Sequence, residues 1–110
     1  MNVEFSYRYR DFGNFKRYGS VVFGNRGGIS TTEIDQAVLR IIGNEQIFAA
    51  SELAIPEMYF TEFPYSPRLD WEIHEYCGVS DTDTRINDAE GRDIQDLITQ
   101  LRLINTRHMK

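Results

Sequence analysis

The chain has 110 residues, of which 41% are hydrophobic and 13% aromatic, and its formal net charge is −5. This length and composition are typical of one folded domain with its own core, and they exclude a disordered chain. With a pI near 4.9, the sequence does not favour a general nucleic-acid binder, whose domain is normally basic.

Two strands are predicted at the start of the chain. Apolar and polar residues alternate over 3–10, which predicts a strand with one buried face made of Val3, Phe5, Tyr7 and Tyr9. A turn signal follows at 11–14. Residues 18–23 then predict a second strand that forms a hairpin with the first.

A helix is predicted next, and its start, buried face and end all agree. Ser30 and Glu33 have the spacing of a capping box, and Gly43 stands where a left-handed residue ends a helix. The apolar stripe between them consists of Ile34, Ala37, Val38, Ile41 and Ile42.

The middle of the chain is harder to interpret. We predict strands over 46–53 and 57–61, separated by Pro56, which no helix would accommodate in its interior. A loop over 62–69 leads to a strand over 70–77, with Trp71, Ile73 and Cys77 on its inner face.

The remaining residues predict a polar loop over 80–90 and a last helix over 93–107. Asp93 is its expected cap, and its buried stripe is Ile94, Leu97, Ile98, Leu101 and Ile104. The predicted order is β-β-α-β-β-β-α. We therefore expect a single α+β domain over 1–110, with a mostly antiparallel sheet and both helices packed on one face.

Four segments of the sequence are distinctive: YRYRD at 7–11, NFK at 14–16, GSVVF at 19–23 and IPE at 55–57. Together they resemble a family of small bacterial proteins to which no activity is assigned. The resemblance covers about the first sixty residues. It implies no catalytic or binding residue.

Charge is divided along the chain. Residues 1–26 contain five basic and two acidic side chains, a net charge of +3, whereas 45–96 contain thirteen acids and three arginines, a net charge of −10. Summed charge governs which molecules approach a surface. We therefore expect a protein-binding module of the inhibitor, immunity or adaptor type, with a basic partner.

The predicted protein-binding patch lies where aromatic residues gather among acids and prolines. Aromatic anchors with a charged rim are typical of interfaces. The candidate residues are Glu57, Tyr59, Glu62, Phe63 and Tyr65.

A small metal-binding protein or enzyme is the first alternative. On an extended strand Asp70, Glu72 and His74 share one face, where they would bind a divalent metal or supply a general base. The competing interpretation is a solvated outer face without a function.

Nucleic-acid binding through the N-terminal hairpin is the second alternative. Basic residues alternate with aromatic ones there, a combination suited to single strands. The candidates are Arg8, Arg10, Lys16 and Arg17. The alternation places Tyr7 and Tyr9 opposite Arg8 and Arg10, so these arginines would instead pair with the protein's own acids.

Several classes of site are not indicated. Residues 24–28 lack the spacing of a phosphate-binding loop, and Cys77 is a lone cysteine, so we expect no cofactor and no disulfide. No apolar run is long enough to cross a membrane, and no signal peptide is recognisable, which predicts a cytoplasmic protein. The sequence leaves open a homodimer formed through an exposed strand, such as 3–9 or 57–61.

Overall fold

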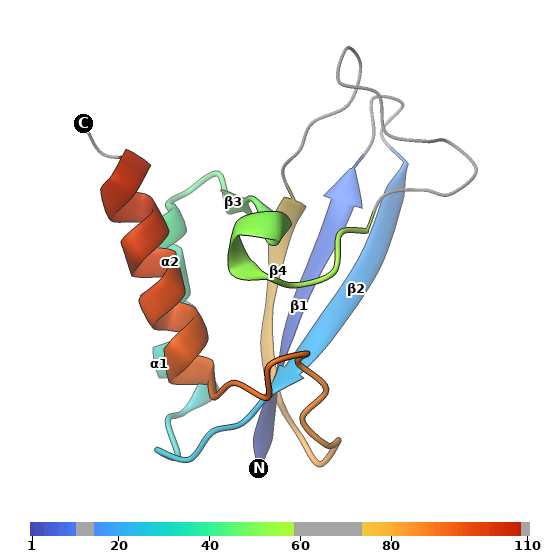
Figure 1. Cartoon of the computed structure of the whole chain (residues 1–110), viewed down its shortest axis with the longest axis vertical. Coiled ribbons are helices and arrows are strands. Elements are labelled where there is room, and N and C mark those ends of the chain that lie inside the picture. Colours follow the sequence, from blue (N-terminus) through green and yellow to red (C-terminus); the bar gives the residue numbers. More distant parts are fainter. Residues whose placement is uncertain (11–14, 59–73, 109–110) are drawn as a thin grey trace.

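The structure, a computed structural model, describes residues 1–10, 15–58 and 74–108 (Figure 1). Its elements are β1 (Asn2–Arg10), β2 (Lys16–Phe23), α1 (Thr31–Ile42), β3 (Ile47–Phe48), the 3₁₀ turn η1 (Ala50–Leu53), β4 (His74–Thr82) and α2 (Ile94–His108). The strands form a curled antiparallel sheet in the order β2-β1-β4-β3. Both helices lie on one side of this sheet, which confirms the α+β prediction (Figure 1).

Strand β1 is the centre of the fold and behaves as its alternation predicts. Its four inward residues, Val3, Phe5, Tyr7 and Tyr9, are at most 1% exposed. Phe5 packs its ring edge against Phe23 of β2, with 6.4 Å between the ring centroids. The aromatic side chains of β1 therefore form the sheet side of the core.

The two helices supply the opposite side of the core, and their ends are those the sequence predicts. The Ser30 hydroxyl accepts a hydrogen bond from the Glu33 N–H, and Gly43 ends α1 with φ 81°. At α2, the Asp93 carboxylate accepts from the Gln95 N–H, and Asp96 accepts from the Asp93 N–H in return. The residues of α2 that face the sheet are Ile94, Leu97, Ile98 and Leu101, all buried.

The predicted strand over 46–53 is wrong in its extent. Only Ile47 and Phe48 pair with β4, after which the chain turns into η1. The buried residues of η1, Ala50 and Leu53, are three apart, which is the period of a 3₁₀ turn. Apolar residues at these positions suit a buried strand as well as a 3₁₀ turn, so the sequence did not distinguish between a strand and a turn.

The predicted strand at 57–61 is not formed in its described part, since 55–58 pair with no strand. The Tyr7 hydroxyl instead donates a hydrogen bond of 2.5 Å to the Pro56 carbonyl. The Met58 side chain lies against Gly19, where an added Cβ would come within 2.5 Å of the Met58 sulfur. The segment 55–58 therefore crosses the inner face of β1 and β2.

Strand β4 is described over His74–Thr82, so it continues five residues beyond the predicted end at Cys77, while 70–73 lie outside the described residues. A bulge interrupts its pairing with β1 at Cys77 and Gly78, where Gly78 has φ 119°. The predicted faces are inverted: His74 and Tyr76 are buried, whereas Cys77 is exposed. Tyr76 lies on the inner face because its ring, whose centroid is 5.3 Å from that of Phe5, buries more apolar surface there than the Cys77 thiol would.

None of the helices in the described ranges is both long and apolar enough to cross a bilayer.

Candidate functional site

The most distinctive surface feature is the outer face of the sheet, the side turned away from the helices. There Arg8 donates from Nε to Glu75 at 2.7 Å, and Arg10 donates to the same carboxylate at 3.1 and 3.2 Å. Partial burial alone would raise the pKa of Glu75, but the two guanidinium groups lower it. Since two arginines share one carboxylate, this cluster has a net positive charge.

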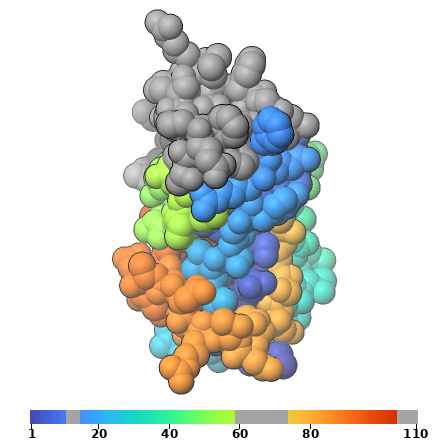
Figure 2. Space-filling model, turned by 90° about the vertical axis from the view of Figure 1, so that its right-hand side faces the viewer, coloured from blue at the N-terminus to red at the C-terminus, as the bar shows by residue number. Residues whose placement is uncertain are grey.

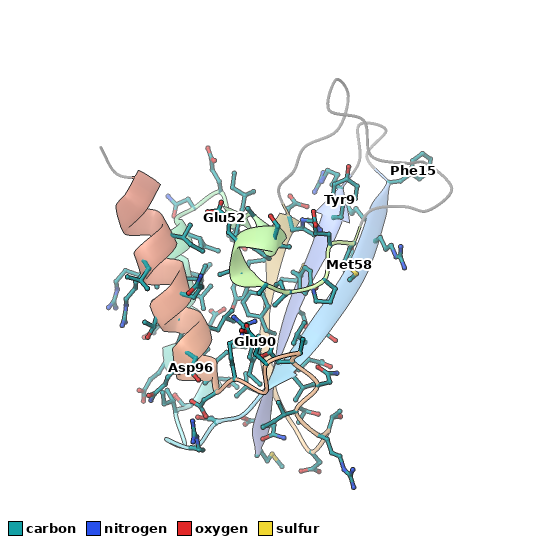
Figure 3. All side chains as sticks on the ribbon, viewed as in Figure 1. Tyr9, Phe15, Glu52, Met58, Glu90 and Asp96 are labelled. Atoms are coloured by element: carbon teal, nitrogen blue, oxygen red, sulfur yellow. The ribbon has the colours of Figure 1, made fainter. Side chains whose placement is uncertain are left out.

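One exposed aromatic side chain, Tyr18, lies beside this cluster, and a second, Phe15, precedes β2. Phe15 is 63% exposed and Tyr18 is 62% exposed, and Figure 3 shows Phe15 projecting outward beyond the start of β2. The Arg8 guanidinium lies 5.8 Å from the Tyr18 ring centroid and donates to its hydroxyl at 3.2 Å. Large aromatic rings held at the surface next to cations are typical of binding sites.

Strand β2 is at the edge of the sheet, and a loop covers one end of it. The Val22 N–H donates to Asn87 Oδ1 at 2.7 Å, and the Val22 carbonyl accepts from the N–H groups of Asn87 and Asp88. The loop thus takes the place of a neighbouring strand at Val22. In Figure 2, β2 lies on the viewer's face between the segment 54–58 and this loop.

A buried ion pair fixes the loop. The Asp88 carboxylate, 1% exposed, accepts from Nη2 and Nε of Arg92 at 2.8 and 2.9 Å. These hydrogen bonds lower the pKa of Asp88, so it remains charged in the fold. Arg92 also lies 5.5 Å over the Phe23 ring, which anchors the loop to the end of β2.

A pocket of about 280 Å³ adjoins the same edge. It is lined by Ser20, Val21, Ala54, Pro56, Asn87 and Ala89. Its walls are small side chains from three segments that are distant in sequence. Its volume is below the usual range for small-molecule sites, so it suits one inserted side chain better than a whole ligand.

The His74 site predicted from the sequence has a different environment. His74 is 0% exposed, and its Nε2 accepts a hydrogen bond of 2.9 Å from the Met58 N–H. Burial among Tyr7, Tyr9 and Phe48 lowers its pKa, which favours the neutral ring. The expectation that His74 lies on a solvated outer face is therefore wrong.

Asp70 and Glu72, the other two predicted metal ligands, lie outside the described residues. Over the described ranges, no group of three metal-ligating side chains forms a possible site. The three-residue metal site stays a prediction, and the Nε2 atom of its histidine already accepts a hydrogen bond from the Met58 N–H.

The predicted protein-binding patch is represented by Glu57 alone, which is exposed. Tyr59, Glu62, Phe63 and Tyr65 lie outside the described residues. Of the predicted nucleic-acid-binding residues, Arg8 and Arg10 bind Glu75, while Lys16 and Arg17 are exposed on β2. Tyr7 and Tyr9 are buried, as expected, and are out of reach of a base.

Comparisons of the chain with protein-family models, with curated proteins and with solved structures gave no match.

Proposed function

We propose that the protein is a non-enzymatic, cytoplasmic protein-binding module of the inhibitor, immunity or adaptor type. The observation that supports this best is the exposed pair Phe15 and Tyr18 at the start of β2. Two rings more than 60% exposed cost solvation free energy unless a partner covers them. Arg8 holds the Tyr18 ring in place before a partner arrives, which lowers the entropy lost on binding.

Two side chains in the described ranges, His74 and Cys77, are of the types that serve as a general base or a nucleophile. The buried His74 accepts a hydrogen bond from the Met58 N–H, and burial lowers its pKa, which favours the neutral ring. Cys77 is exposed, but burial of its sulfur raises its pKa, which disfavours the nucleophilic thiolate. Neither side chain has the environment that activates a general base or a nucleophile.

The partner's charge follows from the surroundings of the two rings. The sequence predicts a basic partner from the acids of 45–96, but Glu75, Asp88 and Asp93 form ion pairs with arginines. On the outer face, Arg8 lies against the Tyr18 ring, and Arg10 and its register partner Lys16 lie toward the start of β2. We therefore propose an acidic partner for this surface, and the basic partner stays a prediction for the patch that begins at Glu57.

The experiment is affinity capture from the native cell with wild-type protein and a Phe15→Ala/Tyr18→Ala variant. We expect the double variant to retain at most about a tenth of the captured partner, since loss of interface anchors commonly costs more than tenfold. Leu103→Ala is the matched control, because Leu103 is an apolar side chain of similar exposure on α2. Equal capture by the double variant and this control would contradict the proposed surface.

The same capture with Phe63→Ala/Tyr65→Ala tests the patch predicted from the sequence. If only that variant loses the partner, the binding site lies in 57–65 instead of at Phe15 and Tyr18. The proposed protein-binding function would still hold.

A further inference from the structure

The backbone of β2 has hydrogen-bonding groups directed away from the sheet. Val22 directs its N–H and carbonyl toward Asn87 rather than toward β1. Alternate residues of an antiparallel strand direct these groups to the same side, and β2 pairs with β1 without a register shift. Tyr18 and Ser20 therefore also direct their backbone groups outward.

These two residues are left uncovered by the described part of the chain. The loop that pairs with β2 stops at Val22, and within the described residues it forms no backbone hydrogen bond with Ser20 or Tyr18. An uncovered strand edge is a template for another extended chain.

The neighbouring pocket adds a side-chain subsite to this edge. It opens beside Ser20, with Ala54 and Pro56 on one wall and Asn87 and Ala89 on another. An extended chain paired with Ser20 would place alternate side chains on opposite faces. One of them would enter the pocket, whose small walls accept an apolar group.

Charge determines which extended chain fits. Strand β2 contains Lys16 and Arg17 and no acid. Glu4 of β1 accepts a hydrogen bond from Ser20 Oγ through its Oε2 at the other end of the open stretch. A second copy of β2 would bring two further cations to an edge that is already basic, so self-pairing is disfavoured.

We propose that β2 receives an extended acidic segment of a partner protein as an added strand along Tyr18 and Ser20, with its acids near Lys16 and Arg17. This rests on the proposed protein-binding function and specifies how the partner is bound. An apolar side chain of the segment fills the pocket beside Ser20.

The probe is an array of eight-residue peptides that alternate Glu with Val, Thr, Ile or Phe, with Lys-for-Glu copies as the charge control. The intact protein is applied at low and moderate salt. We expect the acidic set to bind at least about tenfold better than the basic set, with a preference that falls as salt screens the charges.

Ser20→Pro tests the backbone pairing, because proline removes the outward N–H and is tolerated on an edge strand. Ser20→Ala removes the hydroxyl and keeps the N–H. We expect Ser20→Pro to bind the acidic peptides at least about tenfold more weakly than Ser20→Ala. If Ser20→Pro does not fold, N-methylation of alternate peptide residues removes the peptide's own donors and should weaken binding to the wild-type protein equally.

Four results would overturn the inference. The first is equal binding of acidic and basic peptides. The second is equal binding by the proline and alanine variants, or by methylated and unmethylated peptides. The third is a dimer that Ser20→Pro dissociates, and the fourth is preferential binding of single-stranded oligonucleotides. Capture of the native partner that depends on Tyr18 but not on the Ser20 N–H would reject strand addition and leave the proposed protein-binding function in place. Capture that depends on neither would also reject the surface around Tyr18 as the binding site.

Discussion

The side chain of Asn87 accepts a hydrogen bond of 2.7 Å from the backbone N–H of Val22, and so a loop residue completes the hydrogen bonding of an edge strand. Asn87 in turn donates its own N–H to the Val22 carbonyl. Within the described residues, this exchange marks the end of the part of β2 that the loop covers.

Replacing this acceptor should loosen the loop. Asn87→Ala leaves the Val22 N–H without its side-chain partner, and we expect a loss of about 1 kcal/mol in the free energy of unfolding. Asn87→Asp keeps an acceptor oxygen and serves as the control. Urea denaturation of the three proteins measures the difference, and an alanine variant as stable as the wild type would show that water replaces the bond at no cost.

The buried pair of Asp88 and Arg92 should contribute strongly to stability. Arg92→Met removes the cation and leaves the Asp88 carboxylate buried and uncompensated, which we expect to cost about 3 kcal/mol. Adding Asp88→Asn to Arg92→Met removes the stranded charge and should restore part of the loss. Denaturation curves check this, and a double variant less stable than Arg92→Met would contradict the explanation by a stranded charge.

Stability should fall as the pH drops from about 7 to 5 because of His74. Burial lowers the pKa of His74 in the fold, whereas the unfolded chain binds a proton below about pH 6.5. The unfolded state then holds more protons, so the free energy of unfolding decreases by at most about 1.4 kcal/mol per pH unit over this range.

The variant His74→Gln distinguishes the contribution of His74 to this pH dependence from that of other titratable groups. Its side-chain oxygen is an acceptor for the Met58 N–H at every pH, so the decline between pH 7 and 5 should flatten. Glu75 and Asp88 have lowered pKa values, and their contributions are lost only at more acidic pH. A decline between pH 7 and 5 that is as steep in the variant would assign it to other groups.

Ala54 ends η1 in the left-handed region, with φ 54°. Glycine adopts this conformation without the steric cost that a Cβ brings. We expect Ala54→Gly to raise the free energy of unfolding by about 0.5–1 kcal/mol and Ala54→Val to lower it. Thermal unfolding distinguishes them, and a glycine variant less stable than the wild type would mean that the Cβ contacts outweigh the strain.

The elements with local signals were predictable. Helix α1 carries its cap, its apolar stripe and its terminating glycine within fourteen consecutive residues, 30–43, and β1 shows an unbroken alternation of aromatic and polar residues. These signals depend on neighbours in sequence, so they needed no knowledge of the tertiary fold.

The middle of the chain was not predictable in the same way. The sequence favoured an inner position for Cys77, but the bulge at Gly78 and the fit of Tyr76 against Phe5 reversed the faces of β4. Both depend on β1, which is about seventy residues away. The hydrogen bond from Tyr7 to Pro56, which holds 55–58 over the sheet, is likewise a long-range contact that no local pattern encodes.

Part of the candidate site could have been predicted from the sequence. Tyr18 was not among the predicted site residues, although it lies in phase with Ser20 and out of phase with the inward residues Val21 and Phe23, an alternation from which an outward ring could have been predicted. Asn87 gave no such signal, because an asparagine in a polar loop is typical of any turn.

The most direct test of the central claim is hydrogen–deuterium exchange on the captured complex. The account predicts that the amides of Tyr18 and Ser20 become protected when the partner binds, while the exposed faces of α1 and α2 exchange as before. Protection confined to the helices, with β2 unchanged, would contradict it.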